Sequence, residues 1–348
     1  MPRNDLVLRA ARRERTERTP VWLMRQAGRC DPEYRRFRER NAQPLEVLFS
    51  TPELATEASL LPRRLGVDAI IFYQDILTLL GPLGAPFAFR PEPVTQHAVR
   101  SSADVARLRR YDVAQRLPFV GQTLRQVKAA LADQMPLLGF AGAPLTLLFF
   151  LAAGRSPTQG AAAPQAFLRD EPTAAHRLLE TLADQTADYL AYQIESGADA
   201  VQLFESCADL LDAPQYREFA LPYQVRVFEQ LGRRVPRILF AKEQPDVALL
   251  VESGADVLSV GRCVDLAAAR RQWGERVAFQ GNVDNELLVR GTSAEVVAAT
   301  RACIAAGQHH GHILNLSHGL LRETPIENVC ALINACRQTI LTEPRAAG

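Results

Sequence analysis

The sequence contains no apolar run long enough to cross a membrane, and Lys128 and Lys242 are the only lysines among its 348 residues. A membrane-spanning helix needs about 20 consecutive, mostly apolar residues, so we expect a protein without transmembrane segments or a membrane partner. The first 18 residues lack the apolar core of a signal peptide, and Asp5, Glu14 and Glu17 argue against an organelle transit peptide. These absences predict a cytoplasmic location.

Cysteine is also sparse. The six cysteines stand apart from one another and form no CxxC pair. In a chain of this length the pattern does not match a secreted disulfide framework. We therefore expect reduced thiols, most of them small buried side chains.

Positive and negative charges are nearly balanced over the whole chain, and the formal net charge is +1 at pH 7. No RNA-binding motif is present either, so a nucleic-acid partner is not expected. Residues 1–40 are the exception, since they hold twelve arginines against six acidic residues. The scarcity of lysine shows that arginine is preferred throughout the chain, so this local excess only weakly favours an anionic substrate.

Two signatures of nucleotide-binding α/β folds are missing: GxGxxG does not follow the first apolar run, and GxxxxGK[ST] occurs nowhere. The sequence instead has eight short apolar runs separated by helical segments, at residues 21–24, 68–72, 136–140, 199–204, 236–240, 256–260, 276–280 and 312–316. Such runs are typical of strands buried on both faces of a parallel sheet. They favour an α/β fold, a single (β/α)8 TIM-type barrel, over a doubly wound open sheet.

The domain organisation is expected to be simple, because no Gly/Ser-rich linker or low-complexity tract divides the chain. We predict one barrel domain over residues 1–348, with the Arg-rich residues 1–19 as an N-terminal extension packed on or near the barrel. Residues 81–100, which contain four prolines, predict a long loop over the barrel mouth, and residues 152–164 a second loop.

Helix ends are signalled at several places. The segments 65–70, 195–200 and 252–257 each place a glycine between a helical stretch and a strand, where a left-handed cap is expected. Thr51 before Pro52 predicts a helix start. Thr324 predicts another, with Glu327 completing a capping box.

Polar residues follow most of the predicted strands, and in a barrel of this kind the chemistry collects at the carboxyl ends of the strands. The residues at these positions are Arg25, Arg29, Gln74, Asp75, Glu205, Ser206, Lys242, Gly281, Asn282, Ser317, His318 and Gly319. We expect many of them to converge on one cavity, where forked guanidinium groups would bind carboxylates and Gly28 would allow close backbone approach. Surface ion pairs, helix caps and a structural histidine remain alternatives.

A histidine tract at residues 309–312 resembles a metal-binding sequence. No cysteine or carboxylate at suitable spacing completes it, so no metal is expected there.

The stretch PVWLMRQAGR, residues 20–29, carries a specific resemblance: it is similar to the N-terminal signature of the uroporphyrinogen decarboxylase family of haem and chlorophyll biosynthesis. The similarity continues in family order through DPEYR (31–35), AIIFYQDILT (69–78), GFAGAPLTL (139–147), LPYQ (221–224), QGNVD (280–284) and NLSHG (315–319). MRQAGR and GFAGAP are long and specific, whereas QGN and SHG are weak alone. Together they extend over nearly the whole chain.

The resemblance implies a single (β/α)8 barrel that works as a homodimer without metal or organic cofactor. Its substrate would be uroporphyrinogen III, a cyclic tetrapyrrole with four acetate and four propionate arms. Each acetate would lose CO2, giving coproporphyrinogen III. By motif position the substrate-binding residues would be the arginines Arg25 and Arg29, the central carboxylate Asp75, the pocket residues Ser206 and His318, and the apolar wall residues Phe140 and Phe204.

Two of these residues would be catalytic. Asp75 would stabilise the positive charge of a protonated pyrrole ring. The resemblance often gives an arginine the role of proton donor, here Arg25, but arginine hardly deprotonates and this role is disputed.

The sequence departs from the family pattern at several positions. The tyrosine expected after GFAGAP falls on Phe150, a further substrate-binding position, which keeps the ring but loses a hydroxyl near Asp75. Other departures are Gln74 for a common serine, Cys30 and Asp31 for Tyr-Leu, and Gly261 and Arg262 for Asp-Trp. Two alternatives therefore stay open: a zinc- and cobalamin-dependent methyltransferase of the same superfamily, and a catalytically silent tetrapyrrole-binding protein.

Overall fold

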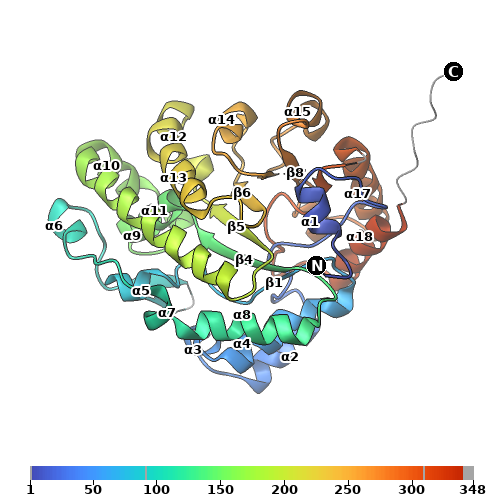
Figure 1. The fold of residues 1–348 in the computed structure, drawn as a ribbon, viewed down its shortest axis with the longest axis horizontal. Coiled ribbons are helices and arrows are strands. Elements are labelled where there is room, and N and C mark those ends of the chain that lie inside the picture. The colour runs from blue at the N-terminus through green and yellow to red at the C-terminus, as the bar shows by residue number, and fades with distance from the viewer. Residues whose placement is uncertain (1, 91, 309, 340–348) are drawn as a thin grey trace.

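The fold is built around a curled sheet of seven parallel strands, with helices around it (Figure 1). Residues 2–90, 92–308 and 310–339 are described in this structure, a computed structural model. The strand order is β1-β4-β5-β6-β7-β8-β9, so each strand pairs with the next strand of the sheet along the chain. The strands are β1 (Ile70–Ile71), β4 (Leu137–Gly142), β5 (Ala200–Glu205), β6 (Arg237–Ala241), β7 (Val257–Val260), β8 (Ala278–Gln280) and β9 (His312–Ile313).

Helices connect the strands on the outside of the sheet, as parallel pairing requires. The longer ones are α2 (Pro32–Arg40), α4 (Pro52–Leu60), α8 (Pro118–Leu131), α9 (Pro144–Ala153), α10 (Ala162–Asp170), α11 (Pro172–Glu195), α13 (Leu221–Leu231), α15 (Leu266–Trp273), α17 (Ser293–Gly307) and α18 (Ile326–Gln338). The shorter ones are α1 (Leu6–Ala11), α3 (Leu45–Ser50), α5 (Leu80–Leu83), α6 (Ser102–Val105), α7 (Val113–Arg116), α12 (Ala213–Phe219), α14 (Val247–Val251) and α16 (Leu287–Arg290), with 3-10 turns η1 (Leu61–Leu65), η2 (Pro157–Gln159) and η3 (Ala208–Leu210). Across the described residues, no helix is long and apolar enough to cross a membrane.

Seven of the eight predicted strands are confirmed, and the first one is not. Residues 21–24 form only a single parallel bridge, between Val21 and Leu314 of the segment after β9. On the other side of Val21, its carbonyl accepts a hydrogen bond of 2.7 Å from the backbone N–H of Asp68. The segment thus lies between the two edges of the sheet but pairs over one residue only. Directly after it, Arg25 adopts a left-handed backbone with φ 61°.

The long loop predicted at residues 81–100 is wrong in part. The segment 81–100 contains the end of α5 and an antiparallel hairpin of β2 (Phe87–Phe89) and β3 (Pro93–Thr95). Residue 91, between these strands in sequence, is outside the described residues. An antiparallel bridge joins Val94 of β3 to Arg155. The second predicted loop, residues 152–164, contains η2 and the start of α10.

The expected glycine joints are confirmed, since Gly66, Gly197 and Gly254 all have positive φ at the ends of helical segments. The expected capping box is wrong. Helix α18 begins after Pro325, which occupies the N-cap position, and the buried hydroxyl of Thr324 makes no hydrogen bond within the described part of the chain.

The N-terminal helix α1 packs against the amino ends of the strands. Its residues Val7, Leu8, Ala10 and Ala11 are buried in a cluster with three residues that lie outside the strands and seven that lie in them: Trp22, Met24 and Ala69, and Leu138, Ala200, Ile238, Phe240, Val257, Ala278 and Ile313. Figure 1 shows α1 in blue beside β8. The interior of the sheet is therefore covered at its amino end by α1, and its carboxyl end is left for a cavity.

Candidate active site

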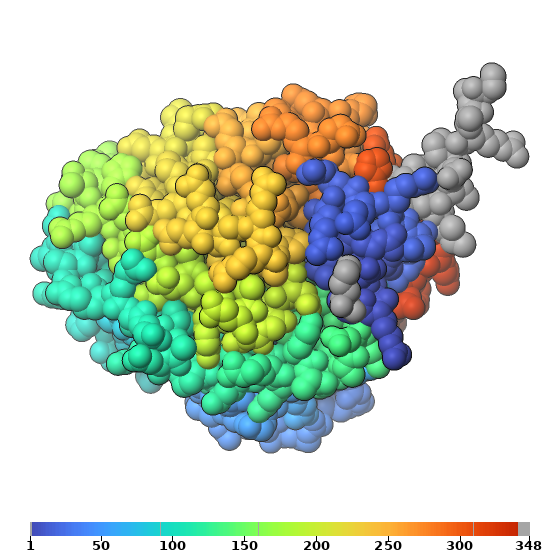
Figure 2. All heavy atoms as spheres, viewed as in Figure 1, coloured from blue at the N-terminus to red at the C-terminus, as the bar shows by residue number. Residues whose placement is uncertain are grey.

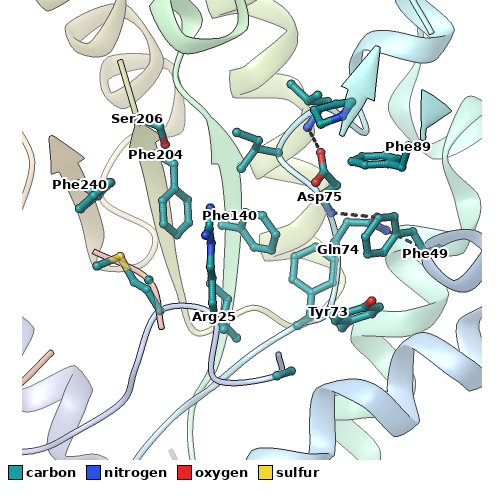
Figure 3. A pocket seen from close by; sticks show the side chains of 18 of the residues that line it. Arg25, Phe49, Tyr73, Gln74, Asp75, Phe89, Phe140, Phe204, Ser206 and Phe240 are labelled. Carbon is teal, nitrogen blue, oxygen red and sulfur yellow. Dashed lines mark hydrogen bonds between the residues drawn. The ribbon is translucent and has the colours of Figure 1, made fainter. Parts of the chain in front are cut away.

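A cavity of about 400 Å³ lies at the carboxyl ends of the strands (Figure 3). All eight residues predicted for substrate binding line it: Arg25, Arg29, Asp75, Phe140, Phe150, Phe204, Ser206 and His318. Among the other strand-end residues, Gln74 and Gly319 line it as well, whereas Glu205, Lys242 and Asn282 do not. Glu205 is fully buried, and its carboxyl group accepts a hydrogen bond from the Thr146 hydroxyl.

Two glycines hold Arg25 in place. A Cβ atom on Gly319 would lie 2.5 Å from Cδ of Arg25, so only a glycine lets the arginine side chain pass at this point. A Cβ atom on Gly28 would lie 2.7 Å from the carbonyl oxygen of Arg25, so Gly28 allows the turn itself rather than a ligand's approach. A left-handed conformation at a non-glycine residue stores strain and is common at functional sites.

The two arginines have free guanidinium groups. Within the described residues, neither the Arg25 nor the Arg29 side chain makes a hydrogen bond or an ion pair, although both border the cavity. Burial lowers the pKa of Arg25, and the nearby carboxylates Asp75 and Glu92 oppose this effect. Arginine stays charged in proteins under any ordinary condition, so the cavity holds unpaired positive charge.

Asp75 lies on the loop after β1, and its carboxylate accepts a hydrogen bond of 2.8 Å from the backbone N–H of Leu77. Burial raises the pKa of Asp75 to about 6; the Leu77 N–H and the charge of Arg25 act in the opposite direction, and the charge of Glu46 adds to the rise. At neutral pH the carboxylate is therefore mostly ionised but poorly solvated. Such a group gains much from a new hydrogen-bond donor.

Gln74 shapes the loop that carries Asp75 (Figure 3). Its side-chain oxygen accepts hydrogen bonds from the Asp75 backbone N–H at 3.2 Å and from the Thr78 hydroxyl at 3.0 Å. Its amide nitrogen donates to the backbone oxygen of Phe49 at 3.2 Å. Gln74 thus ties the loop to α3, a span that the shorter side chain of serine does not bridge.

Aromatic rings form one continuous wall of the cavity. Centroid distances are 5.1 Å from Phe72 to Phe140, 5.6 Å from Phe140 to Phe204, 5.7 Å from Phe204 to Phe240 and 5.6 Å from Phe240 to His318. These tilted and edge-to-face contacts are the favourable ring geometries. The wall offers an extended apolar surface beside the charged groups.

His318 and Ser206 complete the site. Burial, together with the charges of Arg25 and Lys242, lowers the pKa of His318 to about 3, so its ring is neutral at pH 7. Its Nδ1 accepts a hydrogen bond of 2.7 Å from the Gly319 backbone N–H. The backbone N–H of Ser206 donates to the Thr146 hydroxyl at 2.8 Å, which leaves the serine side chain to face the cavity.

Several lining residues were not predicted from the sequence. Phe49 comes from α3 and Phe89 from β2, and their rings meet at 5.9 Å in an edge-to-face contact near Asp75 (Figure 3). Tyr73 and Glu92 also line the cavity. A search restricted to strand ends cannot find residues on a helix and a hairpin; the only available signal was that the hairpin follows Asp75 closely in sequence.

In the described part of the chain, no group of three or more His, Cys, Asp or Glu side chains is arranged to hold a metal ion. Within the histidine tract, His312 is buried and its Nε2 lies 2.7 Å from the Gly281 carbonyl oxygen, while His309 lies outside the described residues.

Comparison with known proteins gives consistent results. The family model described as "Uroporphyrinogen decarboxylase (URO-D)" matches residues 2–339. Curated proteins named uroporphyrinogen decarboxylase from Coxiella burnetii, Chlorobaculum parvum and Alkalilimnicola ehrlichii are 39%, 38% and 39% identical to the chain. The alignments cover 96%, 97% and 97% of the chain and 94%, 98% and 94% of these relatives.

Solved structures resemble the fold. A methyltransferase from Methanosarcina mazei superposes with a TM-score of 0.80 over 97% of this chain and 99% of that one, at 18% sequence identity. At this identity the likeness concerns the fold alone. The family match over residues 2–339 and the full-length relatives establish that the chain belongs to the uroporphyrinogen decarboxylase family.

Proposed function

We propose that the protein is a carboxy-lyase that removes CO2 from the four acetate arms of uroporphyrinogen III to give coproporphyrinogen III. The observation that carries this proposal is the combination, in one aromatic-walled cavity, of an ionised, poorly solvated Asp75 with the unpaired guanidinium groups of Arg25 and Arg29. A macrocycle with N–H donors at its centre and carboxylates at its rim has the complementary chemistry.

The reaction requires a place for the electrons that CO2 leaves behind. Protonation of the ring carbon beside an acetate arm makes the pyrrole cationic, and the electrons of the breaking C–C bond then enter the ring as CO2 departs. The exocyclic methylene that results takes up a proton, and the ring carbon loses its own. Each turnover thus consumes one proton and converts –CH2COO⁻ to –CH3.

Asp75 would act on the ring and the arginines on the arms. The pyrrole N–H groups would donate to the Asp75 carboxylate, whose negative charge stabilises the cationic ring most strongly in the transition state. Arg25 and Arg29 would clamp arms that do not react, turning their binding energy into orientation. Neutral His318 and Ser206 would donate hydrogen bonds to carboxylates, and Phe140, Phe150 and Phe204 would hold the macrocycle by apolar contact.

The architecture of the whole chain is part of the proposal. We infer that the segment around Val21 acts as an eighth strand that closes the sheet into a barrel, supported by its contacts with Leu314 and Asp68 on either side. We also infer that residues 1–348 form one domain with residues 1–19 packed on it, and that the chain works as a homodimer. Light scattering on the purified protein tests the dimer.

The experiment that tests the function is anaerobic incubation of the purified protein with uroporphyrinogen III, followed by oxidation and separation of the porphyrins by carboxylate number. We expect conversion through seven, six and five to four carboxylates, with the same rate in the presence of a chelator. Folded protein that removes no carboxylate would contradict the proposal. Zinc content would then test the methyltransferase alternative, and tetrapyrrole binding the silent carrier.

A further inference from the structure

The Arg-rich N-terminus is a sequence feature that the candidate active site uses only in part. Arg12 and Arg13, directly after α1, line a second cavity of about 440 Å³ together with Arg233, Arg234 and Arg276. We call this cavity the basic cleft. Arg233 and Arg234 precede β6 and Arg276 precedes β8, so the basic cleft lies at the amino ends of the strands, away from the candidate active site. In Figure 2 the blue N-terminal residues lie against the yellow and orange segments of this face.

The positive charge of the basic cleft is largely uncompensated. All five arginines are exposed. Within the described residues, the side chains of Arg12 and Arg233 make no hydrogen bond or ion pair, while Arg13 donates to the backbone oxygen of Arg276. Arg276 itself lies over the Trp273 ring at 5.3 Å. Of these five arginines, Arg234 alone has a salt bridge within the described residues, with 3.5 Å between its Nη1 and a carboxylate oxygen of Glu195.

The one carboxylate that lines the cleft is already occupied. Asp256 accepts hydrogen bonds from Nε of Arg237 at 2.9 Å and from its Nη2 at 3.0 Å, and a third from the Arg237 backbone N–H at 3.0 Å. The Arg237 side chain is buried, whereas the Asp256 side chain is 29% exposed, and both carboxylate oxygens of Asp256 accept from this one arginine. Asp256 therefore does not neutralise the five exposed guanidinium groups.

A sixth arginine lies behind them. Arg270 is 4% exposed, and its Nε and Nη1 atoms have no hydrogen-bond partner in the described part of the chain. A Cβ atom on Gly311 would lie 3.1 Å from Nη1 of Arg270 and 3.3 Å from Cγ of Arg13, so the two arginine side chains are neighbours. Burial lowers the pKa of Arg270, the charge of Glu275 opposes this shift, and the charge of Arg13 adds to it.

We propose that the basic cleft is a binding site for a small oligophosphate, a ligand with several phosphate groups in a row such as inorganic tripolyphosphate or the phosphate chain of a nucleotide. Several guanidinium groups around one concave site can each bind phosphate oxygens through two parallel hydrogen bonds. Gathering like charges in one place is unfavourable without an anion, and a bound polyanion removes this repulsion. The bounded cleft and the net charge of +1 fit a compact ligand rather than a long nucleic acid.

Isothermal titration calorimetry of the full chain with tripolyphosphate tests this proposal. We expect saturable one-to-one binding that weakens as salt is added, because exposed charges are screened. The double variant Arg12→Glu, Arg233→Glu should bind on the order of a hundredfold more weakly, since two charge-assisted contacts are lost and repulsion is added. Its decarboxylation activity should be unchanged, so the outcome is independent of the function proposed for the active site.

Matched controls separate the cleft from general charge. The double variant Arg177→Glu, Arg301→Glu changes the same number of exposed arginines outside the cleft and should bind tripolyphosphate normally. Arg25→Ala should also bind normally, because Arg25 borders the other cavity. A titration with ATP identifies the source: tighter binding than tripolyphosphate assigns a nucleotide, and equal binding assigns the phosphate chain alone.

The proposal would be overturned by either of two results. One is the absence of saturable tripolyphosphate binding by folded wild-type protein. The other is an equal loss of binding in the Arg177, Arg301 control or in Arg25→Ala. Circular dichroism melting of each variant confirms that the proteins compared are folded.

Discussion

At the scale of single residues, Asp75 and His318 both line the cavity, and burial shifts the pKa of each toward its neutral form. Burial raises the pKa of Asp75 to about 6 and lowers that of His318 to about 3. His318 is thus neutral at pH 7, and because its Nδ1 accepts from the Gly319 N–H, its Nε2 is the donor. Asp75, in contrast, is charged although burial favours its neutral form. Keeping the Asp75 carboxylate ionised in the folded protein therefore costs free energy relative to the unfolded chain.

This has a consequence for stability. A carboxyl group whose pKa is higher in the folded than in the unfolded protein destabilises the fold where it is ionised and ceases to do so where it is protonated in both states. We expect Asp75→Asn to be at least as stable as the wild type above pH 6, with the difference shrinking between pH 6 and pH 4 and absent below the ordinary value of 3.8. Urea unfolding across this pH range measures it. A variant much less stable at pH 7 would contradict the raised pKa.

A second residue-scale expectation concerns Phe150, whose ring lines the cavity and meets Phe87 edge-to-face at 6.2 Å. Phe150→Tyr adds a hydroxyl at the position where the sequence resemblance leads us to expect a tyrosine. We expect a few-fold rise in kcat/KM, since one extra hydrogen bond is worth about 1 kcal/mol. Phe150→Leu, which removes the ring, should instead raise KM. Steady-state kinetics of both variants test this expectation. A lower kcat/KM in Phe150→Tyr than in the wild type would show that a hydroxyl at this position does not assist the reaction.

The expectation that residues after the strands converge at one end of the sheet is confirmed for four of them: Arg25, Asp75, Ser206 and His318. It holds because the carboxyl ends of parallel strands lie at the same edge of a sheet. It missed Phe49 and Phe89, since no local pattern says where a helix or a hairpin folds back. The roles of Gly28 and Gly319 could not be predicted either. They depend on the path of the Arg25 side chain and turn, which only the folded chain defines.

At the scale of elements, α3 and the β2–β3 hairpin form one side of the cavity and are joined by Glu46. Its Oε1 accepts a hydrogen bond of 2.7 Å from the backbone N–H of Phe89, while Oε2 is buried without a partner in the described residues. The charge of Glu46 also raises the pKa of Asp75. Glu46 thus links the position of the hairpin with the electrostatics of the site.

The variants Glu46→Gln and Glu46→Ala separate these two effects. Glutamine keeps the acceptor for Phe89 but removes the charge, so the pKa of Asp75 should fall. The acidic limb of the kcat/KM profile should then move to lower pH, with KM little changed. Alanine also frees the hairpin and should raise KM. The pH-rate profiles measure this, and an unmoved acidic limb in Glu46→Gln would exclude the electrostatic link.

Helix ends and buried strands were predicted well, because their sequence patterns are local. Elements whose extent depends on a neighbouring segment of the fold were predicted poorly. The buried runs and the glycine joints at Gly66, Gly197 and Gly254 were visible in sequence. Residues 21–24 look like a strand because they are apolar, but strand length is set by how far neighbours continue beside them. The prolines of the hairpin predict a loop, but Pro93 stands at the start of β3, where a missing backbone N–H is tolerated.

At the scale of the whole molecule, the two ends of the sheet differ in structure: one is open to a cavity and the other is covered by a helix. The carboxyl ends carry the cavity, and α1 covers the amino ends with a side-chain cluster that reaches Met24 and Phe240, both of which also line the cavity. Helix α1 therefore belongs to the same buried cluster as two residues that line the cavity, and it supports their positions. The sequence does not predict this packing, because α1 is short and its flanking residues are rich in arginine. The packing is visible only in the contacts of the folded chain.

The packing of α1 can be measured. Val7 is fully buried in this cluster, so Val7→Ala should lower the free energy of unfolding by about 2 kcal/mol, the usual effect of removing two buried methyl groups. The matched control Val47→Ala removes the same groups from a side chain that is 36% exposed and should change stability by less than about 0.5 kcal/mol. Denaturant unfolding of both variants gives the comparison, and equal effects would show that α1 is only loosely attached.

The central claim is that the Asp75 carboxylate stabilises the cationic ring during loss of CO2. The most direct test is the rate of carboxylate loss from uroporphyrinogen III by Asp75→Asn, measured beside the wild type at pH 7 on protein shown to be folded. Asparagine keeps the size of the side chain but removes the charge. We expect a loss of about 100-fold or more, the range for removing one electrostatic stabiliser of a transition state. A variant that turns over at close to the wild-type rate would contradict the account.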